Sequence, residues 1–350
     1  DAGDDPPAPM GSAEDGDGES TDGSATGDGP TGEDPTGEDP TGEDSADGDP
    51  TGDPTGDPTG DPTGDPTGDP AEPPPGGDTE EPFPIDMGDA PGTPGTYKGL
   101  PLRLVDNGSP TVDPVDGVIG VVCIGMSNAT QECSAYISKL GNELQGVSAQ
   151  VHVVDCAVGG HAIEKWADPA FDGTLWDNCL GRVAQAGLSP DQVRVLYHKA
   201  ADQFTAEADM MTPLPPYPDP QSDYFNFIDN LDALAARVPE KFPSVQAVYT
   251  TSRSYGGFAG QAARGEPLSY EEGHALNTWL ADHPEVDGVW YGWGPYIWAP
   301  DCETGVRNGS DVCYVREDYQ GDGVHPAQGA LDKIAAMIHD RLLAEDWYAG

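Results

Sequence analysis

The chain has 350 residues, a formal net charge of −48 and a sequence pI near 4.1. A surface this acidic repels phosphate backbones and anionic lipid headgroups, so the composition argues against a protein that binds nucleic acid or an anionic membrane. No apolar run reaches the length needed to cross a bilayer, so we expect no transmembrane segment.

The negative charge is concentrated in residues 1–96, which hold 28 Asp and Glu and no Lys or Arg. Within residues 1–95, TGEDP and TGDP repeats place a proline at every fourth or fifth position, which blocks helices and sheet ladders. We therefore predict a disordered acidic linker there, which implies a cell surface or another module to stand away from. Calcium binding is the alternative, but the spacing fits neither the EF-hand nor the RTX repeat.

From residue 96 the composition becomes that of a globular domain, in which apolar, β-branched runs alternate with helical patterns. The predicted strands are residues 117–124, 149–156, 193–198, 245–251 and 286–291. The predicted helices are residues 129–144, 175–186, 225–238, 270–282 and 327–343. This alternation predicts one α/β domain over 96–350, a three-layer α/β/α sandwich around a mostly parallel five-stranded sheet.

The turn after the first predicted strand carries a serine. The apolar run ends at Gly125, and Ser127 follows two residues later at the start of a predicted helix. Open α/β folds place ligands at this edge of the sheet, where the first N–H groups of a helix can bind a developing oxyanion. The alternative is that Ser127 only caps the helix.

A serine nucleophile needs a base and a group that orients the base. His325 is the best candidate base, and Asp322, three residues earlier, can hold its imidazole. The alternative is that Asp322 belongs to a turn and His325 caps the last helix. His, Cys, Asp and Glu show no metal-ligand spacing, so we expect no metal and no cofactor.

Six cysteines in an acidic chain with a long Gly/Pro-rich tether indicate disulfides and an extracellular or cell-surface location. Six cysteines allow 15 complete pairings. The short loop between Cys302 and Cys313 favours that pair, and Cys156 with Cys179 is a second candidate. Cys123 lies inside a predicted strand, where we expect it to be buried.

Aromatic residues gather in the long segment 290–319, which includes Trp293 and Trp298. Long ordered loops often line binding sites, and these rings could stack on sugars. A small secondary core under the loop is an equal alternative. His161 and His198 lie at or just beyond the ends of predicted strands, so we add them, with Asn128, as candidate substrate-binding residues.

Four short blocks, in order, resemble the SGNH/GDSL hydrolase superfamily, and most closely its sialate O-acetylesterase and acetylxylan esterase-type carbohydrate esterases. The blocks read IGMSN at 124–128, VGGHAIEKW at 158–166, LYHKA at 196–200 and DGVHP at 322–326. The resemblance covers residues 115 to 345 and implies an SGNH, flavodoxin-like sheet.

The family's roles then imply Ser127 as nucleophile, His325 as base and Asp322 as the residue that orients the base. The resemblance also implies an oxyanion hole made by the backbone N–H groups of Ser127 and of Gly160 or Gly159. The third donor in such enzymes is normally an Asn or Gln side chain, and Lys199 stands at that position here.

These expectations describe a secreted or surface-tethered serine esterase that forms an acyl-enzyme, with O-acyl or O-acetyl groups on carbohydrate as the substrate. A lipid or polyester esterase of the same fold is one alternative. A non-catalytic carbohydrate-binding module on this scaffold is another, because Lys199 replaces the amide, and a purely structural surface protein is the last.

Overall fold

The computed structural model describes residues 95–97, 100–102, 104–307 and 311–350. The predicted linker therefore lies, apart from Gly95, outside the described residues. A short antiparallel pair of strands, β1 (Gly95–Tyr97) and β2 (Leu100–Leu102), comes first.

The main sheet has six strands in the order β4-β3-β5-β6-β8-β7. Their bounds are β3 Ile119–Ile124, β4 Val151–Asp155, β5 Val193–Lys199, β6 Ala247–Thr251, β7 Glu285–Val286 and β8 Val289–Trp293. The first five strands in this order are parallel, and β7 pairs antiparallel with β8. The mostly parallel α/β sheet is confirmed, with one short edge strand added.

The extra strand arises from a turn that the sequence analysis placed inside a strand at 286–291. Asp287 and Gly288 have positive φ angles of 50° and 80°. An Asp-Gly pair with this backbone makes the tight hairpin turn that reverses a chain within two residues. The predicted fifth strand is therefore two strands, β7 and β8.

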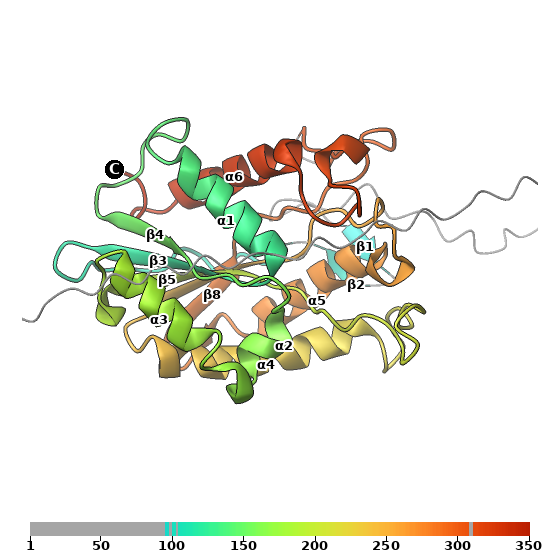
Figure 1. The fold of residues 1–350 in the computed structure, drawn as a ribbon, viewed down its shortest axis with the longest axis horizontal. Helices are drawn as coiled ribbons and strands as arrows, with labels where there is room; N and C mark the ends of the chain where they lie inside the picture. Colours follow the sequence, from blue (N-terminus) through green and yellow to red (C-terminus); the bar gives the residue numbers. More distant parts are fainter. Residues whose placement is uncertain (1–94, 98–99, 103, 308–310) are drawn as a thin grey trace, which may run out of the picture. The chain divides into compact units, whose positions relative to one another are not determined.

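Helices cover both faces of the sheet (Figure 1). Helices α1 and α6 pack against one face, and α2 to α5 pack against the other. The helices are α1 Ser127–Lys139, α2 Ile163–Ala167, α3 Trp176–Gln185, α4 Asp223–Lys241, α5 Leu268–Asp282 and α6 Gln328–Leu343. Four single-turn 3₁₀ helices lie at Pro169–Phe171, Pro190–Gln192, Ala262–Arg264 and Arg316–Asp318. The predicted three-layer sandwich is therefore present.

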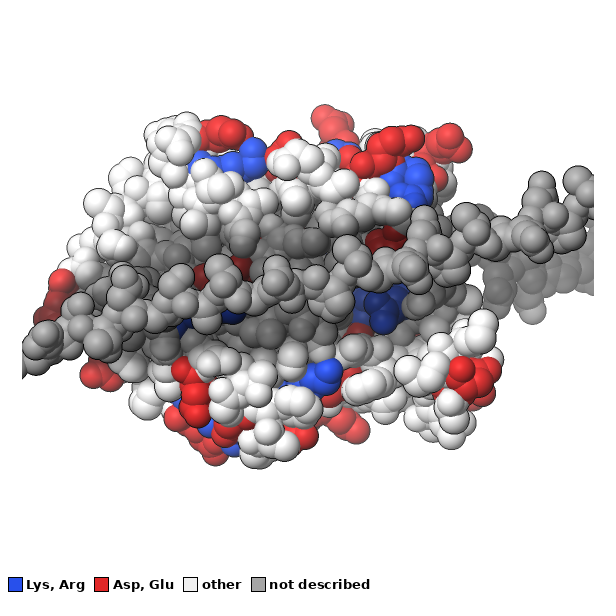
Figure 2. Space-filling view, viewed as in Figure 1, with Lys and Arg blue, Asp and Glu red and all other residues white. Residues whose placement is uncertain are grey.

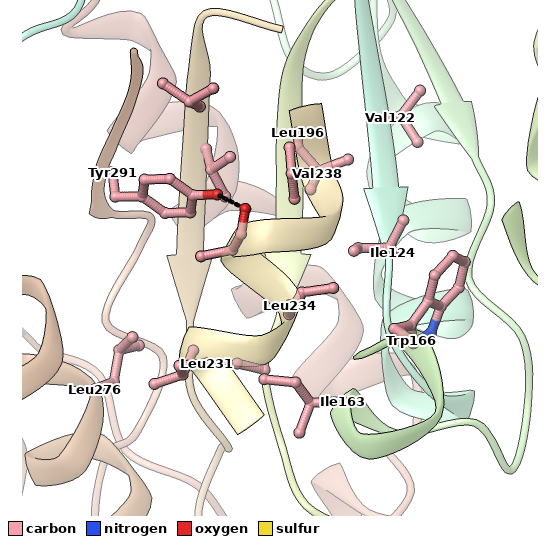
Figure 3. Packing of buried hydrophobic residues seen from close by; sticks show 14 of the residues in the cluster. Val122, Ile124, Ile163, Trp166, Leu196, Leu231, Leu234, Val238, Leu276 and Tyr291 are labelled. Atoms are coloured by element: carbon pink, nitrogen blue, oxygen red, sulfur yellow. Dashed lines mark hydrogen bonds between the residues drawn. The ribbon is translucent and has the colours of Figure 1, made fainter. Parts of the chain in front are cut away.

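Strand β3 is buried on both faces, and its side chains alternate between the two cores. Val122 and Ile124 join the core beneath α2 to α5, whereas Val121 and Cys123 join the core beneath α1 and α6. Figure 3 shows the first core, in which Trp166 lies close to Ile124. Complete burial of one such side chain stabilises the fold by about 1.5–3 kcal/mol.

Acidic side chains form several groups toward the edges of the face shown in Figure 2. Residues 97–350 carry 35 acidic and 15 basic side chains, a net charge of −20. Within the described part of the chain, no helix combines the length and apolarity that a membrane span requires.

Three disulfides link Cys123 to Cys133, Cys156 to Cys179 and Cys302 to Cys313. The favoured pairing of Cys302 with Cys313 and the second candidate, Cys156 with Cys179, are both confirmed. Cys123 is buried as expected, and its bond to Cys133 joins β3 to α1 on either side of Ser127. This crosslink limits how far the turn that carries Ser127 can open.

Replacing both Cys123 and Cys133 by alanine should lower the free energy of unfolding by about 2–4 kcal/mol, because the unfolded chain loses the restriction that the crosslink imposes on it. The matched control is the double alanine variant of Cys302 and Cys313, whose sequence separation of 11 is close to the 10 of the first pair. Chemical denaturation should show similar losses for both variants. Equal stability of the Cys123/Cys133 variant and the unmodified protein would contradict the prediction.

Candidate functional site

Ser127 is the first residue of α1 and follows the carboxyl end of β3. The chain turns there at Gly125, whose φ is +139° and where a Cβ would lie 2.7 Å from both the Ala129 Cβ and the Lys199 carbonyl oxygen. Glycine is therefore required at this turn. Ser127 does not cap the helix, because Met126 holds the cap position and the Ser127 Oγ lies 2.8 Å from His325 Nε2.

His325 and Asp322 lie on the loop before α6. The Nδ1 of His325 is 2.5 Å from Asp322 Oδ2, and the other carboxylate oxygen accepts hydrogen bonds from the backbone N–H groups of Val324 and His325, both at 3.0 Å. Burial raises the pKa of Asp322, but the hydrogen bonds from His325 and the two backbone groups outweigh it and lower the pKa to about 2. The carboxylate is ionised at neutral pH and can orient the imidazole.

Contacts from two other segments, the start of α1 and the loop at residues 258–260, hold this loop in place. Asn128 Nδ2 donates to the Val324 carbonyl at 3.0 Å, which ties the loop to the start of α1. The N–H of Gly260 donates to the Asp322 carbonyl at 2.9 Å. Gly323 has a φ of +71°, and any Cβ there would overlap the carbonyl of Phe258. The distance between His325 and Ser127 is therefore set by packing rather than by a free loop.

The turn after β4 lies beside the serine. A Cβ on Gly159 would be 3.9 Å from the Ser127 Cβ, and Gly160 lines the same cavity as Ser127. His161 Nδ1 donates to the Gly159 carbonyl at 2.8 Å, and Lys165 Nζ donates to the Gly160 carbonyl at 2.6 Å. His161 therefore supports the glycine turn, and it is not among the residues that line the cavity.

Two backbone donors remain available at this point. Among the described residues, neither the N–H of Ser127 nor the N–H of Gly160 donates a hydrogen bond. The first N–H groups of a helix have no partner within the helix, which accounts for Ser127. The expected oxyanion donors are thus both unpaired next to the candidate nucleophile.

A cavity of about 50 Å³ opens at Ser127 and His325. Its lining includes four residues that sequence reasoning missed: Asp202, Gln203, Arg253 and Arg264. Asp202 and Gln203 follow the end of β5, so a search for polar residues just beyond each predicted strand would have found them. Arg253 and Arg264 lie between β6 and α5 and carry no such signal.

Lys199, expected as an oxyanion donor, has its ammonium held by a carboxylate instead. Its Nζ lies 2.5 Å from Glu132 Oε1 on α1, and the two side chains are 2% and 0% exposed. Burial lowers the pKa of Lys199, and the neighbouring Glu132 carboxylate opposes that change. Because the ammonium is held by a carboxylate in the protein interior, it forms a structural ion pair.

Three other candidate substrate-binding residues lie in the interior, away from the cavity. His198 is 1% exposed, and burial lowers its pKa to about 3, which keeps it neutral. Trp293 and Trp298 are 6% and 0% exposed, with indole N–H groups that donate to Asn277 and Glu266. The two tryptophans belong to the main core beneath α2 to α5, rather than to a small secondary core under the loop. Asn128 does line the cavity, while its amide holds the loop.

No cluster of three or more His, Cys, Asp or Glu side chains that could hold a metal ion is present in the described ranges. The groups around Ser127 include its hydroxyl, an imidazole, an ionised carboxylate and two backbone donors. This set of groups can activate a hydroxyl as a nucleophile and bind a negative oxygen next to it.

No protein-family profile and no curated protein matches the sequence. Solved structures do resemble the fold. They include a carbohydrate esterase family 3 protein from Talaromyces cellulolyticus (11% identity, 65% of this chain and 97% of that one, TM-score 0.41). A second is described as a GDSL-like lipase from Parabacteroides merdae (13% identity, covering 67% of this chain and 98% of that one, TM-score 0.42). A third is a catalytic mutant of an acetylxylan esterase from Geobacillus stearothermophilus (12% identity, covering 66% of this chain and 97% of that one, TM-score 0.38).

The second of these descriptions names the GDSL type that the four sequence blocks resemble. At these identities and TM-scores the likenesses carry no argument about activity or substrate.

The Lys199–Glu132 pair gives a test of its structural role. Lys199→Met alone should destabilise the fold by about 3–5 kcal/mol, because it leaves the Glu132 carboxylate buried without a counter-charge. The double variant Lys199→Met with Glu132→Leu should recover most of that stability, and any catalytic turnover with it. Thermal unfolding and turnover of both variants give the comparison. A stable double variant that has lost all turnover would mean that the Lys199 ammonium acts in the site after all.

Proposed function

We propose that this chain is a serine esterase of the SGNH/GDSL hydrolase type, which cleaves ester bonds through an acyl-enzyme. The observation that carries the proposal is the contact of Ser127 Oγ with His325 Nε2 at 2.8 Å while Asp322 holds the other ring nitrogen. A serine whose hydroxyl only filled space would need no imidazole oriented by an ionised carboxylate.

In the first half-reaction His325 Nε2 takes the proton of Ser127 as Oγ attacks the ester carbonyl carbon. The carbonyl electron pair moves to oxygen, where the N–H groups of Ser127 and Gly160 stabilise the negative charge. When that pair returns, the bond to the alkoxide breaks, and His325 gives its proton to the leaving alcohol. The acyl group then stays on Ser127 Oγ.

In the second half-reaction a water molecule loses a proton to the same imidazole and attacks the acyl carbon. Collapse of the second tetrahedral intermediate releases the carboxylic acid and returns the proton from His325 to Ser127 Oγ. Asp322 stays ionised throughout, because its low pKa favours the charged carboxylate beside the imidazolium.

The size of the cavity supports a short acyl group. A volume of about 50 Å³ holds a few water-sized groups at about 10–15 Å³ each, which is enough for an acetyl group. We therefore propose O-acetyl groups, on carbohydrate as the sequence blocks imply. A lipid or polyester esterase is the competing proposal, and a binding module without turnover is the alternative from another class.

The three disulfides support a location outside the reducing cytosol. Within this proposal residues 96–350 form the hydrolase domain, and residues 1–95 form an acidic spacer that tethers it at a cell surface.

Substitution of the proposed catalytic residues tests the activity itself. Ser127→Ala and His325→Ala should each lower kcat for an acetate ester by several orders of magnitude, about 10⁴-fold or more, because the three residues act as a unit. A fluorophosphonate probe should label the unmodified protein at Ser127 and leave Ser127→Ala unlabelled. The control is Ser134→Ala on the same helix as Ser127. It removes a hydroxyl that donates a hydrogen bond to Asp155 of β4, and it should keep full activity. Hydrolysis that survives Ser127→Ala would end the proposal.

A series of p-nitrophenyl esters tests the acyl specificity. We expect kcat/KM to be highest for acetate and to fall by at least about tenfold by octanoate, since the longer chain does not fit a cavity of about 50 Å³. We also expect the protein to release acetate from acetylated xylan or from an O-acetylated sialate. A preference for the long chain would favour the lipid or polyester esterase, and binding of the polysaccharides with no turnover of any ester would favour the binding module.

A further inference from the structure

A buried acid that the mechanism above does not use lies in the crevice next to Ser127. In the order β4-β3-β5-β6-β8, the chain leaves β3 and β5 toward opposite sides, and ligands of open α/β folds bind at such a switch point. Ile124 at the end of β3 pairs with His198 at the end of β5. The residues just beyond both strands therefore meet, and Asp202 lines the same cavity as Ser127 and Gly160.

Asp202 is fixed by contacts from three elements. Its N–H donates to Glu272 Oε1 at 3.1 Å, and its carbonyl accepts a hydrogen bond from Arg253. In the side chain, Oδ1 accepts from Asn230 Nδ2 at 3.0 Å. Oδ2 has no hydrogen-bond partner among the described residues, although the residue is only 2% exposed. The carboxyl group of Asp202 is thus held in place through Oδ1, while Oδ2 has no partner and can donate or accept a hydrogen bond at the cavity.

The surroundings of Asp202 favour the neutral acid. Burial raises its pKa well above the usual range, and the nearby carboxylates of Glu164 and Glu272 raise it further. The Asn230 hydrogen bond and the Arg253 charge oppose this shift without reversing it. Arg253 is itself paired with Glu272 at 2.7 Å. The titratable and charged groups around Asp202 are Glu164 of α2, Asp223 of α4, Glu272 of α5, Arg253 after β6, and Arg264 and His325 across the cavity.

We propose that Asp202 donates, through Oδ2–H, the third hydrogen bond to the oxyanion of the tetrahedral intermediate on Ser127. The inference rests on the proposed esterase function and fills the place that Lys199 leaves vacant by pairing with Glu132. The proton stays on Oδ2 throughout, so the acid stabilises charge and takes no part in proton transfer. A carboxylic acid kept neutral by its site can act as an oxyanion donor in this way.

The proposal gives turnover a specific dependence on pH. When Asp202 loses its proton, the donor is replaced by a negative charge facing the oxyanion, so kcat falls as the pH rises through the raised pKa of the group. An asparagine at this position would keep the donor at every pH. Its oxygen would accept from Asn230 as Oδ1 does now, which turns its NH₂ group toward the cavity.

The experiment compares Asp202→Asn and Asp202→Ala in the full chain, with kcat for p-nitrophenyl acetate measured between pH 6 and pH 10. At pH 7 we expect Asp202→Ala to lose about 10²–10³-fold in kcat, the usual effect of removing one oxyanion donor, and Asp202→Asn to stay within about tenfold of the unmodified protein. The fall in kcat at alkaline pH should be weaker in Asp202→Asn. Thermal unfolding confirms that both variants are folded.

Binding of phenylboronic acid, which forms a tetrahedral adduct on serine, gives a readout independent of turnover. Asp202→Ala should bind it more weakly by about the same factor as its loss in kcat, and Asp202→Asn should restore the affinity. A folded Asp202→Asn variant as impaired as Asp202→Ala in both measurements would overturn the inference while leaving the esterase proposal intact. Absence of both ester hydrolysis and fluorophosphonate labelling in the unmodified protein would overturn both.

Discussion

The site depends on one hydrogen bond, between the hydroxyl of Ser127 and the imidazole of His325, which joins residues 198 positions apart. A parallel sheet makes this contact achievable, because every strand delivers its following loop to the same edge. Ser127 arrives there directly from β3. His325 arrives from the far end of the chain, on a loop held by the Asn128 amide and by Gly260. Anything that lets this loop move away from α1 separates the base from the nucleophile.

The same crevice contains an unusual number of buried charges for a site that must bind a neutral ester group. Lys199 is paired with Glu132, and Arg253 is paired with Glu272. Asp202 contacts the second pair through its backbone, and burial, together with the neighbouring carboxylates, raises the pKa of its side chain. Buried pairs of this kind rarely add stability by themselves, but they fix the positions of the loops they connect. Here the loops are those that follow β5 and β6, and both border the cavity.

Much of this arrangement could be predicted from local sequence. The apolar run before Gly125, the Gly-Gly pair after the second strand and the Asp-x-x-His block before the last helix each define their own local structure, and the structure brings all three together. The Asp287-Gly288 pair could also have been predicted from the sequence to form a hairpin turn, but the apolar residues on both sides made one continuous strand the simpler interpretation. The errors at Lys199, Trp293 and Trp298 have a different origin. A side chain's direction after a strand depends on what lies opposite, and nothing near Lys199 in sequence announces Glu132.

The sequence by itself determined the alternation of strands and helices, the turn that presents Ser127 and the pairing of Asp322 with His325, because each depends on residues within a few positions of one another. Only the tertiary structure decided which polar groups face the cavity and which are neutralised in the interior. Those outcomes depend on partners about 20 to 70 residues away, such as Glu132 for Lys199 and Asn230 for Asp202. Burial and charge act through space, so the raised pKa of Asp202 follows from the packing of α2, α4 and α5 around the end of β5.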